Sequence, residues 1–596
     1  MSHADWKRVA RTLAVPALIL ALVAFTPLAR NRDTAPTLAA WTPMTPVSVS
    51  YGQTSADDEA KGNLLGFNDF HGAIDKPSGS GGLINGVPAG GVEFLTSWIK
   101  QLRSDAVAEG RKSETVAAGD LIGASPLVSA AFHDEPTIEL MNLLGLSRSS
   151  VGNHEFDEGV TELKRMQFGG CHPTDGCQDG DGFRGADFRY LSANVVNKSN
   201  GLPILAPIDV EFFDGVPVGF VGMTLEGTPS IVNPAGITTV NFLDEIETAN
   251  KWGGLLRLFG VKALVLLIHE GGAQNAAPPL NISSCDVFAG AISGIVAGLR
   301  PEFGIVISGH THRFYSCALP NASGGNSVVT SAGANGQLVT DIDFSLDKSS
   351  RRFAKISAHN VIVANSDPTM SDPQAKVLAD KYRTAVAPIA NRVVGSITQT
   401  ITRDVLPTSN FESPLGDVIA DAQLAWTQSA GAQIALMNPG GIRASLSAAG
   451  PLGAGEVTFG QCFTVQPFNN LVVTQTLTGA QLKAVLEQQL FPLTPTSTVR
   501  ILQVSDGFTY TYDTSPAADG NRVLNMTLDG VDIDPAVSYR VTTNDFLANG
   551  GDGFTALTGG TNRVTAPGFD VDAFVAYIGA NSPVPPGPAN RITRQP

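Results

Sequence analysis

Side chains that bind metal ions recur at the ends of apolar, strand-like runs in the first half of this sequence. They are Asp69 and His71 after "NLLGF", Asp120 after "ETVAAG", Asn153 and His154 in "VGNHEFDEG", His269 after "ALVLLI", and His310 and His312 after "GIVISG". Because the carboxyl ends of strands in an α/β sheet share one edge, we expect these loops to converge although they lie far apart in the sequence.

Oxygen and imidazole donors of this kind suit two divalent cations about 3.5 to 4 Å apart, with one carboxylate bridging them. The lack of Cys in the set favours Mn²⁺, Zn²⁺ or Fe²⁺ over a structural zinc site. Such a pair generates hydroxide near neutral pH and holds the oxygens of an in-line displacement at phosphorus. Each motif alone is also typical of a simple turn, so the prediction depends on their conjunction. The histidines outside these loops are interpreted as structural: His3, His133, His172 and His359.

Length and composition indicate a folded protein with more than one domain. The chain has 596 residues, 43% of them hydrophobic, which predicts two domains of about 200 to 300 residues. The net charge of −16 argues against a nucleic-acid polymer as partner, because such a partner requires clustered Lys and Arg. A small anionic substrate in a local site remains compatible with this charge.

The N-terminus has the pattern of an export signal. Lys7, Arg8 and Arg11 precede the apolar run "TLAVPALILALVAFTPLA", which is typical of a signal peptide. The run is also close to the lower length limit for a membrane span, so an uncleaved anchor is the alternative. We therefore expect residues 1–40 to be a signal peptide or an anchor, and the protein to be periplasmic, secreted or at the cell surface. Membrane contact is expected only through that anchor.

The five cysteines fit an exported protein. Cys171 and Cys177 bracket the short loop "CHPTDGC", for which a local disulfide is the preferred interpretation. A zinc site with His172 is the weaker alternative, because a fourth ligand is missing. Cys285 and Cys317 form the next plausible pair, and Cys462 is left over.

Alternating strand-like and helix-like segments predict an α/β domain over residues 60–345. Residues 346–392 are interpreted as a connection that contains one long helix over 372–391, with Asp372 as its cap and Pro388 near its end. A second α/β domain is expected over 393–575, followed by a Pro-rich, extended tail at 576–596.

The motifs "FNDFHG", "AAGDLIGASPL", "GNHEFDEG", "LIHEGG" and "ISGHTH", in this order, resemble the calcineurin-like metallophosphoesterase domain. Together with "NPGGIR", "VQPFNN" and "NDFLANGGDGF" they resemble the 5'-nucleotidase family, which includes periplasmic UDP-sugar hydrolases and 2',3'-cyclic-nucleotide phosphodiesterases. The resemblance covers about residues 60 to 575. It implies a four-layer α/β-β-α metallophosphoesterase domain followed by an α/β nucleotide-specificity domain, with the long helix as a hinge.

The resemblance also implies roles for individual residues of the first domain. One metal would be held by Asp69, His71 and His312, the other by Asn153, His269 and His310, with Asp120 bridging. His154 matches the catalytic histidine that stabilises the transition state, and Asp157 matches the acid that orients it. A carboxylate at this spacing keeps an imidazole cationic and in one orientation. The family often has Gln at the position of His312.

In the second domain the resemblance implies a substrate pocket. Arg443 with nearby Asn438 would bind the phosphate, Phe468 and Phe546 would stack on the base, and Asp552 would contact the ribose hydroxyls. Without the motif context, the two Phe residues would be interpreted as core. One departure is Ser409, where the family usually has an Arg. Because bidentate Arg contacts are strong, this change puts a preference for 5'-monophosphates in doubt.

The sequence therefore predicts an exported two-metal nucleotide hydrolase of the 5'-nucleotidase type. The alternatives are a 2',3'-cyclic-nucleotide 2'-phosphodiesterase with 3'-nucleotidase activity, a UDP-sugar hydrolase, or a sulfur-ester hydrolase. A non-catalytic surface binding protein is a further alternative.

Overall fold

The computed structural model describes residues 46–52, 55, 58–77, 82–178, 180–274, 281–405, 411–449, 453, 455–490, 500–515 and 521–595, all within one compact unit. The expected signal or anchor at residues 1–40 lies outside the described residues, and so does Ser409. Among the described residues, no helix combines the length and the apolar character that a bilayer span requires.

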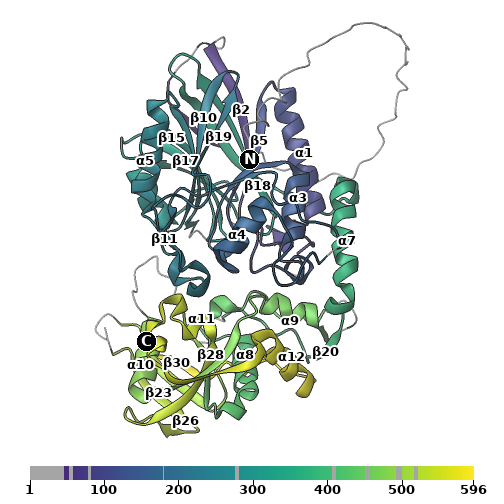
Figure 1. Ribbon diagram of the computed structural model, residues 1–596, viewed down its shortest axis with the longest axis vertical. Coiled ribbons are helices and arrows are strands. Elements are labelled where there is room, and N and C mark those ends of the chain that lie inside the picture. Colours follow the sequence, from purple (N-terminus) through teal and green to yellow (C-terminus); the bar gives the residue numbers. More distant parts are fainter. Residues whose placement is uncertain are drawn as a thin grey trace, which may run out of the picture. The chain divides into compact units, whose positions relative to one another are not determined.

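Two β-sheets form the centre of the first half of the chain (Figure 1). In spatial order, the first contains β1 (Val47–Ser50), β19 (Arg352–Ile362), β18 (Leu338–Asp347), β2 (Glu59–Phe67), β5 (Lys112–Ala118), β6 (Leu146–Ser150) and β7 (Arg189–Leu191). The second contains β16 (Phe314–Pro320), β17 (Asn326–Ala332), β15 (Phe303–Ser308), β12 (Ala263–His269), β10 (Val216–Thr224) and β9 (Ile208–Phe213). Strands β2, β5 and β6 run parallel in the first sheet, and β10, β12 and β15 run parallel in the second.

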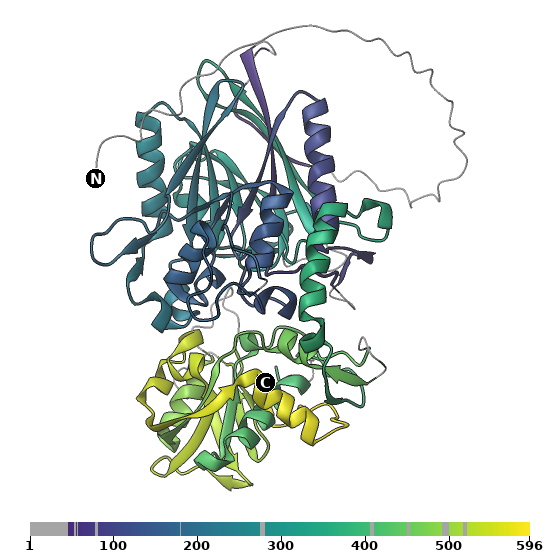
Figure 2. The ribbon, with the colours of Figure 1, turned by 45° about the vertical axis from the view of Figure 1, so that its right-hand side comes forward.

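The two sheets pack face to face. Leu64 and Val116 of the first sheet share a buried core with Val265 and Ile305 of the second. Helices α5 (Glu245–Leu258) and α6 (Ala291–Gly298) cover the outer face of the second sheet, where residues such as Leu266 are buried. Helix α1 (Val92–Ala108) lies against β2 and β5 on the opposite outer side (Figures 1 and 2). The four expected layers are therefore confirmed.

Strand β19 extends the first sheet beyond residue 345, where we expected the connection to begin. It pairs with β18 on one side and β1 on the other. Its alternating buried and half-buried residues explain why it belongs to the sheet: one face of the strand contributes to the core.

The long helix expected over 372–391 is confirmed as α7 (Pro373–Ala390). The side chain of Asp372 caps it by accepting from the main-chain N–H groups of Gln374 and Ala375. The helix packs against α1 and α3 (Glu135–Leu144), and the Tyr382 hydroxyl donates to Glu139 at 2.8 Å. Its role as a hinge stays a prediction.

The second half of the chain is α/β, as expected. Its larger sheet contains β24 (Gln503–Val504), β21 (Ile434–Met437), β28 (Ser538–Asn544), β23 (Leu471–Thr478) and β29 (Thr561–Phe569). A second sheet contains β27 (Val531–Asp532), β26 (Val523–Leu528), β25 (Phe508–Asp513) and β30 (Ile592–Gln595). The main helices are α8 (Pro414–Trp426), α9 (Phe459–Val465), α10 (Gly479–Gln488) and α12 (Asp570–Ala580). The end of the expected Pro-rich tail is thus a strand that pairs with β25.

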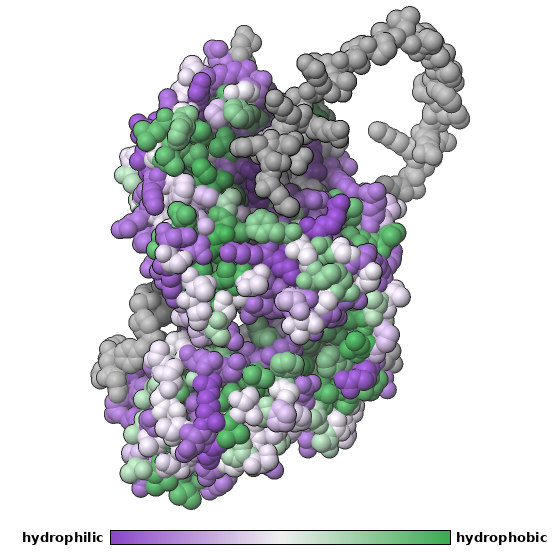
Figure 3. All heavy atoms as spheres, viewed as in Figure 1, coloured by the Kyte–Doolittle hydropathy of each residue, from purple (hydrophilic) through white to green (hydrophobic). Residues whose placement is uncertain are grey.

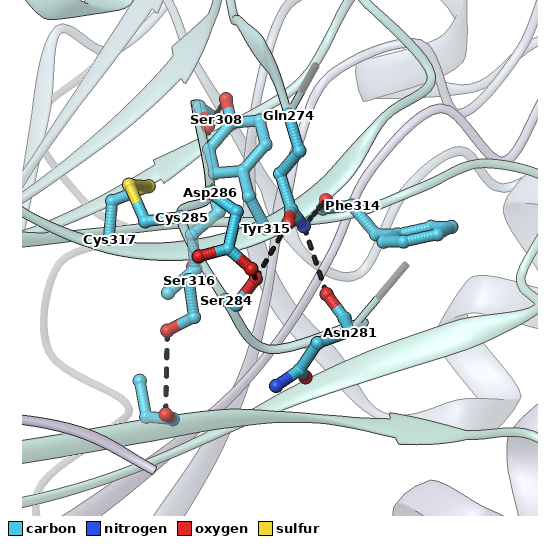
Figure 4. The surroundings of a disulfide bond; sticks show 12 residues. Gln274, Asn281, Ser284, Cys285, Asp286, Ser308, Phe314, Tyr315, Ser316 and Cys317 are labelled. Carbon is cyan, nitrogen blue, oxygen red and sulfur yellow. Dashed lines mark hydrogen bonds between the residues drawn. A yellow bond between two sulfur atoms is a disulfide. The ribbon is translucent and has the colours of Figure 1, made fainter. Parts of the chain in front are cut away.

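Both expected disulfides are present, Cys171–Cys177 and Cys285–Cys317, and Cys462 is a buried free cysteine. Around the second disulfide, the Gln274 side chain donates to the main-chain oxygens of Asn281 and Phe314 at 3.0 and 2.9 Å (Figure 4). The disulfide and these bonds tie the segment before α6 to β16. Figure 3 shows hydrophilic and hydrophobic residues interspersed on the face of Figure 1, as is usual for a folded surface.

Candidate active site

The strand-end loops bring the predicted ligand residues together at the carboxyl ends of parallel strands. Asp69 and His71 follow β2, Asp120 follows β5, Asn153 and His154 follow β6, His269 ends β12, and His310 and His312 follow β15. Asn153 and Asp120 are nearly inaccessible to solvent, as are Asp69, His71 and His269. Strands β2, β5 and β6 belong to the first sheet, and β12 and β15 belong to the second. The site therefore lies where the two sheets meet.

Five of these residues have left-handed main-chain conformations, with φ of 50° at Asp69, 49° at His71, 50° at Asp120, 69° at His310 and 55° at His312. Such values are uncommon outside glycine, and they cost free energy that the surrounding structure must offset. Strain of this kind concentrates at functional sites, because it directs side chains that a relaxed turn would not bring together.

A first group consists of Asp69, His71 and His312. Nε2 of His71 lies 3.0 Å from Nε2 of His312, and the latter lies 3.4 Å from Oδ1 of Asp69. These three atoms are close enough to ligate one ion.

A second group consists of Asp120, His269, His310 and Asn153. Nε2 of His269 lies 2.9 Å from Oδ2 of Asp120, and Nδ1 of His310 lies 3.0 Å from Oδ1 of Asn153. The same Asp120 oxygen is 3.7 Å from Nε2 of His71 in the first group. Asp120 therefore stands between the two groups, where a bridging ligand would be.

The ring orientations fit a pair of cations. Nδ1 of His71 lies 2.9 Å from the carbonyl oxygen of Gly123, and Nδ1 of His269 lies 2.8 Å from that of Ala118. A histidine that donates one ring N–H to such a partner presents its other nitrogen to a metal. Nε2 of His269 is buried without a hydrogen bond, although a carboxylate oxygen is close. A proton or a cation is needed between them, and the oxygen and nitrogen donors suit Mn²⁺, Zn²⁺ or Fe²⁺.

The acidic and imidazole side chains of the site shift one another's pKa values. Although burial raises it, neighbouring imidazoles hold the pKa of Asp120 well below its usual range, His269 first and then His154. Burial opposes protonation of His269, but the charge of Asp120 raises its pKa to about 10. Burial, and next the charge of His269, lowers the pKa of His310 to about 3.

His154 and Asp157 form a pair beside these groups. Nδ1 of His154 lies 2.8 Å from Oδ2 of Asp157, within a 3-10 turn over His154–Phe156. Burial alone would lower the pKa of His154, but the charges of Asp157 and Asp120 raise it above the ordinary value. The ring also meets that of His71 edge to face at 5.0 Å. An imidazole with a raised pKa and an orientation fixed by Asp157 therefore borders the ligand groups.

Glu155 is a residue of the site that the sequence analysis missed. Its buried carboxylate accepts from the main-chain N–H groups of Asp120, Leu121 and Gly152, at 2.9, 2.8 and 2.6 Å. It thereby joins the loop after β5 to the loop after β6. Burial, and next the charge of Asp120, raises its pKa to about 7. The sequence signal that could have identified Glu155 is its position in the motif "GNHE".

A cavity of about 790 Å³ adjoins His154 and Asp157. All five predicted substrate residues line it: Asn438, Arg443, Phe468, Phe546 and Asp552. The Phe468 ring stacks on the His154 ring at 5.7 Å, and the Arg443 guanidinium lies 5.7 Å from the same Phe ring. Asn438 donates to the Asp552 carboxylate at 2.8 Å. Phe546 both lines the cavity and packs on the core of the second half, so the core interpretation holds for part of its surface.

His133 and His172, interpreted as structural, also lie together. Their rings stack at 3.8 Å with an interplanar angle of 12°, and the Asp175 carboxylate is 2.9 Å from Nε2 of His133 and 3.4 Å from Nδ1 of His172. Parallel rings do not direct two lone pairs at one ion, and the disulfide Cys171–Cys177 removes the nearby thiolates. The structural interpretation is therefore kept.

The chain is similar to known proteins over most of its length. The family model for the 5'-nucleotidase C-terminal domain matches residues 393–559. The chain is 31% identical to "Endonuclease YhcR" of Bacillus subtilis over 533 residues, which cover 88% of this chain but only 40% of that protein. It is 32% identical to "Cell wall protein Lmo0130" of Listeria monocytogenes over 551 residues, covering 88% of this chain and 68% of that one.

The crystal structure of a 5'-nucleotidase precursor from Thermus thermophilus superposes with a TM-score of 0.72 at 27% identity, covering 90% of this chain and 100% of that one. The fold over 90% of the chain is that of a 5'-nucleotidase, and residues 393–559 match the 5'-nucleotidase C-terminal domain. The chain belongs to the 5'-nucleotidase family.

Proposed function

We propose that this protein is an exported phosphoester hydrolase that uses two divalent cations and acts on nucleotides. The observation that carries the proposal is the convergence of two ligand groups around Asp120, with the His154–Asp157 pair between them and the aromatic cavity. Family membership supports the same reaction class.

The residues present fit two cations. Asp69, His71 and His312 would hold one, Asn153, His269 and His310 the other, and Asp120 would bridge. When bound, such cations lower the pKa of an attacking water and stabilise charge on the phosphate oxygens. Mn²⁺, Zn²⁺ and Fe²⁺ are the candidates from the donor set.

The chain's own residues would complete the chemistry. His154, kept cationic by Asp157, would stabilise the developing charge and donate a proton to the leaving oxygen. Arg443 would bind the phosphate, since a guanidinium matches its geometry. Phe468 and Phe546 would stack on the base, and Asp552, positioned by Asn438, would accept from ribose hydroxyls. The size of the cavity suits a mononucleotide.

Export is part of the proposal. The basic and apolar N-terminal pattern predicts it, two disulfides favour an oxidising compartment, and one relative is named a cell wall protein. Separation of culture medium, cell envelope and cytoplasm, followed by blotting for the protein, tests this point. Recovery in the cytoplasm alone would contradict it.

A substrate panel tests the activity. AMP, 2',3'-cyclic AMP and UDP-glucose separate the three ester types, and single-stranded DNA is added because one relative is named an endonuclease. We expect AMP hydrolysis that EDTA abolishes and that Mn²⁺, Zn²⁺ or Fe²⁺ restores. Preferred turnover of another substrate would select the corresponding alternative. Turnover of none, with cations bound, would favour the non-catalytic binding protein.

A further inference from the structure

Asp134 is a buried carboxylate outside the two ligand groups. It immediately precedes α3 and is 7% exposed. Its Oδ1 accepts from the Ser129 hydroxyl at 2.6 Å, and its Oδ2 accepts from the main-chain N–H of Gly123 at 3.0 Å. Burial raises the pKa of Asp134, and these hydrogen bonds oppose that effect. Because a carboxylate is costly to bury unless hydrogen bonds compensate it, the contact with Gly123 is a specific one.

Gly123 connects Asp134 to the first ligand group. Its N–H donates to Asp134, and its carbonyl oxygen accepts from Nδ1 of His71 at 2.9 Å. Since a carbonyl oxygen can only accept, Nδ1 of His71 carries the proton and Nε2 keeps its lone pair. Nε2 is the atom that lies 3.0 Å from Nε2 of His312. The main chain of one residue thus links the carboxylate to a ligating imidazole.

The main chain at Gly123 leaves little room for adjustment. Its φ of 80° is in the left-handed region. A Cβ atom at this position would lie 2.6 Å from the carbonyl oxygen of His154 and 2.8 Å from Oδ2 of Asp157. Gly123 is therefore packed closely against the His154–Asp157 pair, and the groups bound to its N–H and carbonyl determine where its carbonyl oxygen lies.

Two buried carboxylates hold different parts of the loop after β5. Glu155 accepts from two N–H groups at the start of the loop, where Asp120 lies. Asp134 accepts from the N–H of Gly123 further along. Glu155 thus fixes the part of the loop that contains the bridging ligand, and the part that orients His71 depends on Asp134.

We propose that Asp134 is a positioning residue for the first metal ion, because through Gly123 it holds the carbonyl oxygen that orients the imidazole of His71. The inference rests on the two-cation site of the proposed function and adds a residue from outside the ligand set. Loss of a direct partner of a ligating histidine typically weakens metal binding about 10- to 100-fold. Asp134 acts through one more residue, so we expect an effect of about 10-fold, at the lower end of that range.

The test is calorimetric titration of Mn²⁺ into the metal-free full chain, as wild type, Asp134→Gly, Asp134→Asn and Asp372→Ala. Glycine removes the carboxylate without straining the main chain, which has φ of 60° at Asp134. Asparagine keeps an oxygen for the Gly123 N–H and gains an amide that can donate to the Ser129 hydroxyl. Asp372 is the matched control, since it is also a buried carboxylate that accepts from two main-chain N–H groups.

In Asp134→Gly we expect the dissociation constant of one of the two Mn²⁺ ions to rise about 10-fold. Asp134→Asn should bind both ions nearly as tightly as wild type, because it keeps the acceptor. Asp372→Ala should lower the thermal midpoint and leave both dissociation constants unchanged. At saturating Mn²⁺, kcat for AMP in Asp134→Gly should return toward the wild-type value, because the defect is one of metal affinity.

Unchanged Mn²⁺ dissociation constants in Asp134→Gly would overturn the assignment, even if the thermal midpoint falls. An equal weakening in Asp134→Asn would show that the charge matters and not the acceptor, and an equal weakening in Asp372→Ala would assign the effect to general destabilisation. Either result overturns the proposal. If wild type binds Mn²⁺ but hydrolyses no phosphoester, the proposed activity fails, and the comparison of dissociation constants still decides the role of Asp134.

Discussion

The Asp157 carboxylate lies 2.8 Å from Nδ1 of His154 and fixes the orientation of the imidazole beside the ligand groups. Burial lowers the pKa of His154, but the charge of Asp157 opposes this effect and helps to raise the pKa above its ordinary value. We expect His154→Ala to lower kcat about 10²- to 10⁴-fold, the usual contribution of a general acid. Asp157→Asn should lower it less, because the ring remains but loses its counter-charge.

The control for this pair is metal content, measured by plasma mass spectrometry on the same samples. If the two variants keep wild-type metal content, the loss is assigned to proton transfer and charge stabilisation. Full phosphatase activity in His154→Ala with metal bound would mean that the assigned role is wrong.

Asp120→Asn should lower the number of bound cations below two per chain. Oδ2 of Asp120 lies 3.7 Å from Nε2 of His71 and 2.9 Å from Nε2 of His269, one residue in each ligand group, and an amide is a poorer bridge than a carboxylate. Metal analysis after dialysis against Mn²⁺ gives the stoichiometry without reference to activity. Asp532→Asn, on the exposed strand β27, is the matched control and should bind as wild type does. Two cations retained in Asp120→Asn would exclude the bridging role.

Phe468→Ala should discriminate between substrates with and without a base. Stacking contributes about 1 to 3 kcal/mol per base, so we expect kcat/KM for AMP to fall about 5- to 150-fold. p-Nitrophenyl phosphate has no nucleobase, so its kcat/KM should fall less than that of AMP in Phe468→Ala. Some loss is still expected, because Phe468 also contacts His154 and Arg443. Equal losses of kcat/KM for both substrates would indicate that the Phe468 ring positions the catalytic groups and does not stack on the base.

Replacing both Cys285 and Cys317 by Ser should destabilise the first domain. The disulfide closes a loop with a sequence separation of 32, and a loop of this size corresponds to about 2 to 4 kcal/mol. Calorimetry of the double variant should show a lower midpoint for the transition of that domain. Cys462→Ser tests a cysteine without a disulfide and separates cross-linking from the effect of a buried polar substitution.

His133 should make stability depend on pH. Its hydrogen bond to Glu158, together with Asp175 and the charge of Glu162, raises its pKa from 6.5 to about 9, while His172 stacks on its face. Because the folded-state pKa is raised, the contribution is complete below about pH 6.5 and is lost as the pH rises through about 9. Solvent reaches the two carboxylates, so we expect only ~1 kcal/mol.

Denaturant unfolding of wild type and His133→Gln at pH 6, 7.5 and 9.5 measures this contribution. The difference in unfolding free energy should shrink as the pH rises. A difference that is constant with pH would assign the effect of His133 to packing.

The residues of the ligand groups were predictable because local signals are strong there. An apolar run such as "ALVLLI" is buried on both faces, which marks a parallel strand within the sheet, and a polar residue at its carboxyl end must reach the sheet edge. The cap of α7 at Asp372 was predicted from the start signal of the helix, and both disulfides from the positions of the cysteines. Each of these depends on a short segment or on a strand end whose direction the topology fixes.

The other features depend on contacts between distant segments, for which the sequence carries no periodic signal. Strand β19 joins the first sheet because its register with β18 buries one face. Glu155 has a structural role because its carboxylate accepts hydrogen bonds from three main-chain N–H groups in two loops. Arg403 lines the cavity because one short bridge aligns Ile401 with Leu446. The sequence alone determined which residues could bind a metal ion. The tertiary structure decided which charged side chains lie close together, because the pairing of remote strands and loops follows from packing and register and not from a local sequence pattern.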